Sequence, residues 1–93
     1  MPKRVDANQA EIVQALRQVG ASVHSLAGVG CGCPDLAVGY RGVTYLLEVK
    51  GCRGKLTPGQ VEWHDEWRGQ VAIVRNIDEA LETIGAIEKA VRG

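Results

Sequence analysis

The chain has 93 residues, an apolar fraction of 45% and equal numbers of acidic and basic residues, which leave no net charge. This length fits a single domain, and the apolar content excludes a disordered protein. No apolar run approaches the roughly 20 residues of a membrane span, and residues 1–11 lack the apolar core of a signal peptide. We therefore expect one cytoplasmic globular domain over residues 1–93, with no membrane contact.

Hydrophobic periodicity and turn residues predict seven elements in the order α-β-β-β-α-β-α. They are a helix ending at Gly20, strands over 21–26, 36–40 and 43–50, a helix from Thr57 to about Arg68, a strand over 70–75, and a last helix to roughly Val91. The continuous apolar run over 70–75 predicts a central strand. This order indicates an α/β sandwich around a mixed sheet.

Capping residues support the helix starts. Asp6 or Asn8 can cap the first helix. Thr57, followed by Pro58 and then Gln60, predicts a capping box, and Asn76 with Glu79 predicts a second one. The first helix has an apolar stripe of Ile12, Val13, Leu16 and Val19.

The most informative stretch contains a Pro-Asp pair ending at Asp35 and a Glu-Val-Lys triplet from Glu48 to Lys50. Each motif alone is common in turns and strands. A two-residue turn at 41–42 places Asp35 opposite Glu48, with Cβ atoms about 4.5–5.5 Å apart, where like charges destabilise a sheet. A divalent cation would compensate, and strand alternation puts Lys50 on the face of Glu48. The register therefore predicts a metal site with an adjacent amine.

Charge and cysteines add weaker indications. The segment 41–55 carries four cations against one acid, so a positive edge lies beside the motif, although these can equally be solvated loop charges. Three cysteines at 31, 33 and 52 have no CxxC spacing and are expected to remain thiols. A zinc site completed by His24 and His64 is the disfavoured alternative.

On these residues the chain resembles the VRR-NUC nucleases of the PD-(D/E)XK superfamily, small stand-alone domains often found in phage genomes and related to Holliday-junction resolvases. The resemblance covers almost the whole chain. It depends on the segments ANQAEIVQALRQVGASV, GCPDLAVGYRGVTYLLEVKG, KLTPGQVEWHDEW and VAIVRNIDEAL. It implies a restriction-endonuclease-like fold and hydrolysis of phosphodiester bonds in DNA.

The resemblance also implies residue roles. Asp35, Glu48 and the backbone carbonyl of Val49 would bind Mg²⁺ or Mn²⁺, ions that favour hard oxygen ligands. Lys50 would orient the attacking water and offset charge on the phosphate. Glu11 matches a metal-binding acid of the first helix in such nucleases; its alternative is a solvated glutamate.

Several residues beside the motif are further candidates for the site. Gln60 matches the glutamine of an LTPxQ motif near the catalytic lysine, and its alternative is the capping box; both roles can hold together. The same helix face also carries Trp63, His64 and Trp67. We interpret His64 as a packed or hydrogen-bonded histidine, with a catalytic base as its alternative, and the two tryptophans as core or dimer-interface residues, with base stacking as theirs. Arg53 and Lys55 are the candidates for contacts with DNA phosphates, and His24 has no assigned role.

The leading hypothesis is a metal-dependent, structure-selective DNA endonuclease that cuts branched DNA such as four-way junctions. Resolvases make paired nicks, and this chain carries one set of site residues, so a homodimer is expected. The alternatives are a flap or nicking nuclease or an exonuclease of the same superfamily, and a catalytically silent DNA- or protein-binding module. A zinc-ribbon-like binder is more remote.

Overall fold

The computed structural model describes the backbone of residues 4–88 and the side chains of residues 7–88. The elements follow the predicted order. They are α1 (Arg4–Gln18), β1 (Ser22–Ser25), β2 (Leu36–Tyr40), β3 (Val43–Val49), α2 (Pro58–Glu66), β4 (Ala72–Val74) and α3 (Ile77–Thr83). In this part of the chain no helix has both the length and the apolar character needed to cross a membrane. The fold is a single α/β domain with a mixed sheet.

The sheet has the strand order β1-β2-β3-β4, with β1, β2 and β3 antiparallel and β4 parallel to β3. Arg41 and Gly42 both have positive φ, 50° and 81°, which is the conformation of a two-residue hairpin turn that follows the twist of the strands. The pairs run from Tyr40–Val43 to Leu36–Leu47. The predicted hairpin register is confirmed for the residues of both strands.

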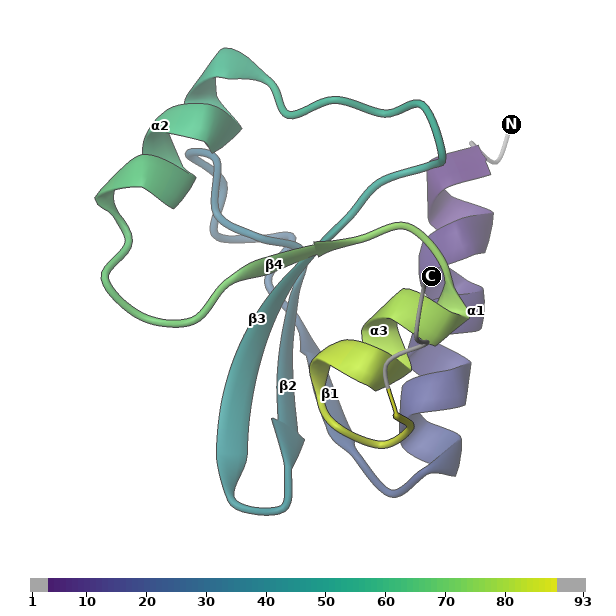
Figure 1. Ribbon diagram of the computed structural model, residues 1–93. Helices are drawn as coiled ribbons and strands as arrows, with labels where there is room; N and C mark the ends of the chain where they lie inside the picture. Colours follow the sequence, from purple (N-terminus) through teal and green to yellow (C-terminus); the bar gives the residue numbers. More distant parts are fainter. Residues whose placement is uncertain (1–3, 89–93) are drawn as a thin grey trace, which may run out of the picture.

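One face of the sheet carries the hydrophobic core, covered by α1 and α3, which lie side by side (Figure 1). The core residues are Ile12, Leu16, Ala21, Val23, Leu36, Val38, Leu47, Val49, Val74, Ala80 and Ile84. Strand alternation turns Leu47 and Val49 into this core, so Glu48 faces the opposite side. The opposite face is therefore where the chemistry of the motif must lie.

Helix α2 stands apart from α1 and α3, on the other side of the sheet (Figure 1). It contains no buried residue. The backbone of the glycine-rich loop approaches its first turn so closely that a Cβ on Gly32 would meet the carbonyl of Gly59. Gly32 also has a φ of +82°, which glycine adopts without strain. A close backbone contact therefore fixes the start of this helix against the domain, and none of its side chains is fully buried.

The start of α1 and the exposure of Val19 differ from the prediction. The helix begins at Arg4, so Asp6 and Asn8 lie inside it and the predicted caps are wrong. The helix ends at Gln18, and Val19, expected in the apolar stripe, is 36% exposed. Gly20, with a φ of 93°, ends the helix as predicted because it accepts a left-handed conformation.

The C-terminal elements also need correction. Strand β4 is at the edge of the sheet rather than central, because β3 is its only partner among the described strands, and Ile73 is 38% exposed. Helix α3 ends at Thr83 instead of near Val91 because Gly85, with a φ of 78°, turns the chain. There the N–H of Ala86 donates to the carbonyl of Leu81, a closing pattern of helix C-termini. Residues 89–91 of the predicted helix lie outside the described residues.

Candidate active site

Asp35 stands at the open end of the β2–β3 hairpin. Its backbone is fixed by the buried Pro34 before it and by the N–H of Leu26, which donates to the Asp35 carbonyl at 2.8 Å. Strand pairing stops at Leu36–Leu47, one pair short of the predicted Asp35–Glu48 pair. Instead the Asp35 side chain crosses to β3, where its Oδ2 accepts the N–H of Val49 at 2.7 Å. The two acids meet through side chains and not through a strand pair.

Glu48 is a buried carboxylate with incomplete hydrogen bonding. It is 1% exposed, and its Oε1 has no hydrogen-bond partner among the described residues. The pKa of Glu48 is raised to about 8, because burial disfavours the charged carboxylate and because the neighbouring Asp35 stabilises the protonated form; Lys50 acts in the opposite direction. An unpaired buried carboxylate oxygen costs free energy. This position therefore favours a bound cation.

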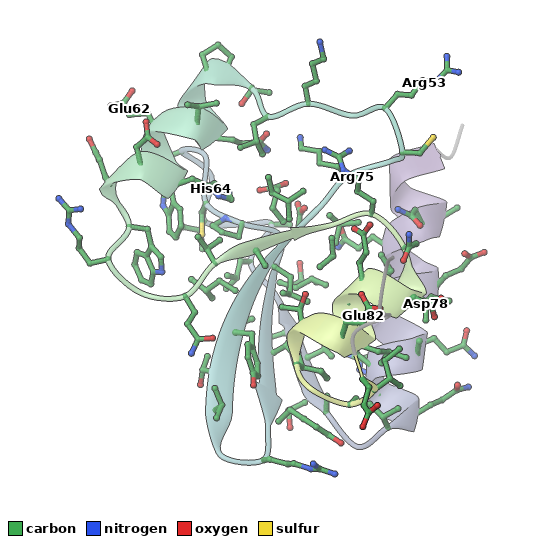
Figure 2. All side chains as sticks on the ribbon, viewed as in Figure 1. Arg53, Glu62, His64, Arg75, Asp78 and Glu82 are labelled. Carbon is green, nitrogen blue, oxygen red and sulfur yellow. The ribbon has the colours of Figure 1, made fainter. Side chains whose placement is uncertain are left out.

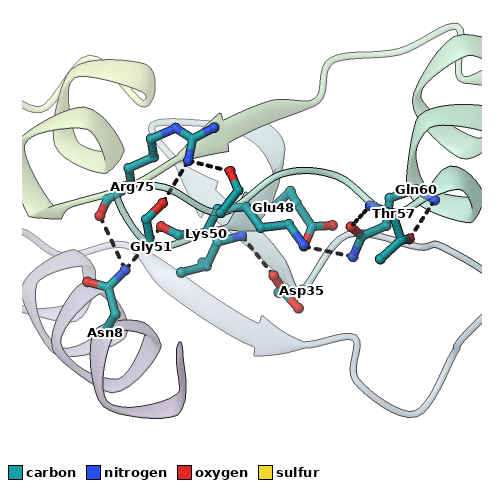
Figure 3. Close-up of polar contacts among 10 residues, drawn as sticks. Asn8, Asp35, Glu48, Lys50, Gly51, Thr57, Gln60 and Arg75 are labelled. Carbon is teal, nitrogen blue, oxygen red and sulfur yellow. Dashed lines mark hydrogen bonds and ion pairs between the residues drawn. The ribbon is translucent and has the colours of Figure 1, made fainter. Parts of the chain in front are cut away.

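Lys50 and Gln60 both lie beside the second carboxylate oxygen of Glu48, Oε2. The Lys50 Nζ lies 4.0 Å from Glu48 Oε2, and the Gln60 Nε2 donates to the same oxygen at 3.3 Å. Both contacts leave Oε1 free. Lys50 is thus held beside the acid pair, as the strand alternation predicts (Figure 3).

Gln60 forms the predicted capping box and also contacts Glu48. Its Oε1 accepts the N–H of Thr57 at 2.9 Å, while the Thr57 hydroxyl accepts the N–H of Gln60 at 3.2 Å. This is the predicted capping box. Because the amide oxygen is used by Thr57, the amide nitrogen is turned towards Glu48. The start of α2 thereby orients a donor at the site.

The second predicted capping box is only half formed. The Asn76 Oδ1 accepts the N–H of Glu79 at 2.8 Å. The Glu79 Oε1, however, accepts the N–H of Arg75 at 2.8 Å rather than that of Asn76. Glu79 therefore fixes the backbone of Arg75, just after β4.

Two residues that the sequence did not assign to the site, Asn8 and Arg75, secure the segment after Lys50 (Figure 3). The Asn8 Nδ2 donates to the carbonyls of Lys50 at 3.3 Å and Arg75 at 3.2 Å. The Arg75 guanidinium donates to the carbonyls of Gly51 and Gly54. No local sequence signal marks either contact, since the bonded residues are 21 to 67 positions apart.

Glu11 is placed elsewhere. It is exposed on α1 and lines a hollow of about 240 Å³ with Asn8, Asn76, Ile77 and Asp78, on the α1–α3 side of the molecule. Across the described side chains, no three His, Cys, Asp or Glu residues gather where they could hold a metal. The structure therefore does not bring Glu11 together with Asp35 and Glu48.

The remaining candidates lie around this centre. Arg53 and Lys55 are exposed on the loop that leads from β3 to α2, and Figure 2 shows Arg53 projecting away from the domain. Cys31, Cys33 and Cys52 are free thiols. Burial, and secondarily the charges of Glu48 and Asp35, raises the pKa of the Cys33 thiol. Together with His24 and His64 the cysteines form no metal-binding group in the described part of the chain.

The aromatic residues of α2 and of its C-cap, Trp67, form a small cluster of their own. The rings of Trp63 and Trp67 stack with centroids 4.7 Å apart, and Trp67 is 42% exposed. His64 meets Trp63 edge to face, and its Nε2 is buried without a hydrogen-bond partner. His64 is thus a packed histidine, and neither tryptophan belongs to the core. His24 is exposed on β1 and has no role here.

The donor set fits a hard divalent cation. Asp35 and Glu48 are adjacent carboxylates, and the orphaned Glu48 Oε1 has no other partner. Mg²⁺ is commonly bound by one or two carboxylates with retained waters, so a third acidic side chain is not needed. A cation would restore the charged form of Glu48 that burial disfavours.

No family model matches the sequence, and no curated protein matches it. Among solved structures, one described as a VRR_NUC domain superposes on this chain with a TM-score of 0.71 and 27% sequence identity. The match covers 89% of this chain and 96% of that one. The chain is a VRR-NUC domain. The VRR-NUC domain implies a nuclease-type function, and the acid pair with Lys50 is the group of residues suited to it.

Proposed function

We propose that this VRR-NUC domain is a Mg²⁺- or Mn²⁺-dependent, structure-selective DNA endonuclease that cuts branched DNA as a homodimer. The observation that carries the proposal is Glu48, a buried carboxylate whose Oε1 is unpaired beside Asp35, with Lys50 at 4.0 Å from its other oxygen. Burying such a group without a function would destabilise the domain. Perturbed carboxylates in contact with a lysine are typical of catalytic sites.

Each residue of the site has a separate role in the proposed hydrolysis. Asp35, Glu48 and the carbonyl of Val49 would hold the metal ion, which when bound lowers the pKa of a water and neutralises phosphate charge. The ammonium of Lys50 donates to the attacking water and stabilises the negative charge that develops on the phosphate. Gln60 keeps Glu48 Oε2 in place through its 3.3 Å hydrogen bond. Arg53 and Lys55 contact the DNA phosphates on either side.

Branched DNA and the homodimer are the more specific parts of the proposal. A four-way junction is resolved by two nicks, so two copies of a chain with one site would act on it together. The paired nicks would be symmetric about the two-fold axis of such a dimer. Sedimentation of the protein at micromolar concentration, free and bound to a junction, tests the dimer independently of cleavage.

The direct test is cleavage of a synthetic four-way junction with Mg²⁺, with Mn²⁺ and with EDTA. We expect cleavage only with metal, and a loss of about 10²–10³-fold for Lys50→Ala, the range for removing one donor that stabilises developing charge. Asp35→Ala should lose cleavage as well. Arg17→Ala, a cation on α1 outside the site, is the control and should cut like the wild type. Cleavage that survives EDTA or Lys50→Ala would refute the assignment.

The same assay separates the related activities. A 5′ flap, a nicked duplex and a linear duplex are compared with the junction, and product ends are mapped. Preference for the flap would identify a flap nuclease, and single-nucleotide products from the linear duplex an exonuclease. Absence of cleavage on all substrates, with binding retained, would identify a catalytically silent DNA-binding module.

A further inference from the structure

The segment after Lys50 is a tight turn that a distant arginine closes. Within Gly51–Gly54, the N–H of Gly54 donates to the carbonyl of Gly51 at 3.0 Å. One nitrogen of Arg75, Nη1, donates to the carbonyls of Gly51 at 2.7 Å and Gly54 at 2.8 Å. The first and last residues of the turn are thus bound to the same nitrogen (Figure 3).

Arg75 is itself held from two sides. Its N–H donates to Glu79 Oε1 at 2.8 Å, which ties it to α3. Its carbonyl accepts from Asn8 Nδ2 at 3.2 Å, and the same amide donates to the carbonyl of Lys50 at 3.3 Å. Helix α1, helix α3 and the ends of β3 and β4 therefore meet at this arginine. The backbone of Arg75 is thus fixed by these elements, and from there its guanidinium reaches the turn.

The turn determines the positions of two cationic residues, Arg53 and Lys55. Arg53 lies between the two glycines whose carbonyls Arg75 binds, and Lys55 follows directly. Both are exposed. A Cβ on Gly54 would lie 3.3 Å from the Cβ of Lys50, so the turn also rests against the base of the catalytic lysine. With glycine at both ends, an unanchored turn would be flexible and would have to be ordered when DNA binds.

We propose that Arg75 is a positioning residue: by closing the Gly51–Gly54 turn it pre-orders Arg53 and Lys55 to receive DNA phosphates next to Lys50. The inference rests on the proposed nuclease function for its substrate. Arg75 acts through the turn and not through its own contact with DNA. Its hydrogen bonds are to carbonyl oxygens of the chain, and charged donors give the stronger bonds of this kind.

The first experiment needs no DNA. Trypsin cuts after arginine and lysine, so the rate of cleavage after Arg53 and Lys55 reports how often the turn opens. We expect Arg75→Met to raise this rate about tenfold, because it removes two charge-assisted hydrogen bonds. Arg17→Met is the matched control, since Arg17 Nη2 also donates to a backbone carbonyl, that of Val23 at 3.2 Å, but far from the turn. Equal cleavage in wild type and Arg75→Met would overturn the proposal.

The second experiment measures binding of a fluorescein-labelled four-way junction with Ca²⁺ in place of Mg²⁺, for Arg75→Met, for Arg53→Ala/Lys55→Ala and for the triple variant. We expect Arg75→Met to weaken binding about tenfold and to reduce its salt dependence. In the triple variant the added Arg75→Met should cost less than about twofold, because Arg75 acts through the two cations. Additive losses would show that Arg75 contacts DNA itself and would overturn the proposal.

A second variant and the combination of the two experiments keep the outcomes distinct. If Arg75→Met does not fold, Arg75→Lys, which keeps a cationic donor, replaces it in both experiments and should show the same direction with a smaller change. If the wild type neither binds nor cuts any DNA, the proposed function fails while the trypsin result still decides whether Arg75 closes the turn. If the wild type cuts the junction and Arg75→Met behaves like it in both assays, only the role of Arg75 fails.

Discussion

The two sides of the sheet are held together by different forces. On the α1–α3 side, fully buried aliphatic residues such as Ile12, Leu16 and Leu47 form one continuous core. On the α2 side no residue of the helix is buried. There the helix is attached by a backbone approach between Gly32 and Gly59 and by the hydrogen bond from Gln60 to Glu48. Stability is concentrated on one side, and the candidate chemistry lies where the other side joins it.

This division has a physical reason. A carboxylate pair for a metal must keep polar partners and access to a substrate, so it cannot sit inside an apolar core. Glu48 solves this by alternating with Leu47 and Val49, which anchor β3 in the core while the acid faces α2. The rigid side thus holds the acid at a fixed place. The α2 side supplies the Gln60 amide, which orients the carboxylate of Glu48, and no residue of the helix is buried for this.

The largest expected effect on stability tests the core side. Leu16→Ala removes a fully buried side chain from the cluster, so we expect a loss of about 2–5 kcal/mol in the free energy of unfolding. Val61→Ala on α2, where the side chain is 44% exposed, should change it by less than about 0.5 kcal/mol. Urea titration followed by circular dichroism measures both. Similar losses would contradict the division between the two sides.

A smaller effect tests the backbone contact of α2. In Gly32→Ala the new Cβ would meet the carbonyl of Gly59. Gly30→Ala is a matched control, since Gly30 also has a positive φ, 72°, but nothing lies within 4 Å of the added Cβ. Both variants share the strain of a left-handed alanine. We therefore expect Gly32→Ala to lose about 1–3 kcal/mol more than Gly30→Ala in urea titrations.

The Gly32 comparison extends to activity. Displacing the first turn of α2 moves Gln60 away from Glu48, so junction cleavage by Gly32→Ala should fall by about tenfold or more, as small misplacements near a catalytic centre do. Cleavage by Gly30→Ala should stay near that of the wild type. Equal stability and equal cleavage in the two variants would mean that α2 is not docked through this contact.

The sequence predicts best what local residues decide. The turn at Arg41–Gly42 determines the hairpin register, because two residues with positive φ leave a single way to pair the strands. The start of α2 follows from Thr57, Pro58 and Gln60 in the same way. The hairpin signal alone already predicts that Asp35, Glu48 and Lys50 lie close together, and the helix signal predicts where Gln60 begins α2.

What the sequence could not predict depends on distant partners. Asn8 looks like a helix cap, but its amide is used by carbonyls 42 and 67 residues away. The apolar run around β4 looks central, yet the strand lies at the edge, since periodicity does not reveal how many neighbours a strand has. Glu11 has the right spacing from the apolar stripe, but the direction in which α1 presents it depends on how the helix docks beside α3.

The smallest expected effect on stability separates the two roles of Gln60. Thr57→Ala removes the hydroxyl that caps α2 but leaves the amide of Gln60 facing Glu48, so stability should fall by about 1 kcal/mol while cleavage changes little. Gln60→Glu keeps an acceptor for the Thr57 N–H, and glutamate suits this place in a capping box. The capping of α2 should therefore be retained, and any loss of stability in this variant should come from its contact with Glu48.

Gln60→Glu keeps the helix cap but disrupts the contact with Glu48 in the site. It replaces the donor to Glu48 Oε2 by a third carboxylate beside Asp35 and Glu48, and like charges in contact repel. Cleavage of the junction should therefore fall by about 10–100-fold, measured as kcat at saturating metal, since loss of one oriented donor costs this order. If Thr57→Ala reduced cleavage as strongly as Gln60→Glu, Gln60 would matter only for starting the helix. A loss confined to Gln60→Glu would instead mean that α2 is kept beside the sheet mainly to aim this one amide.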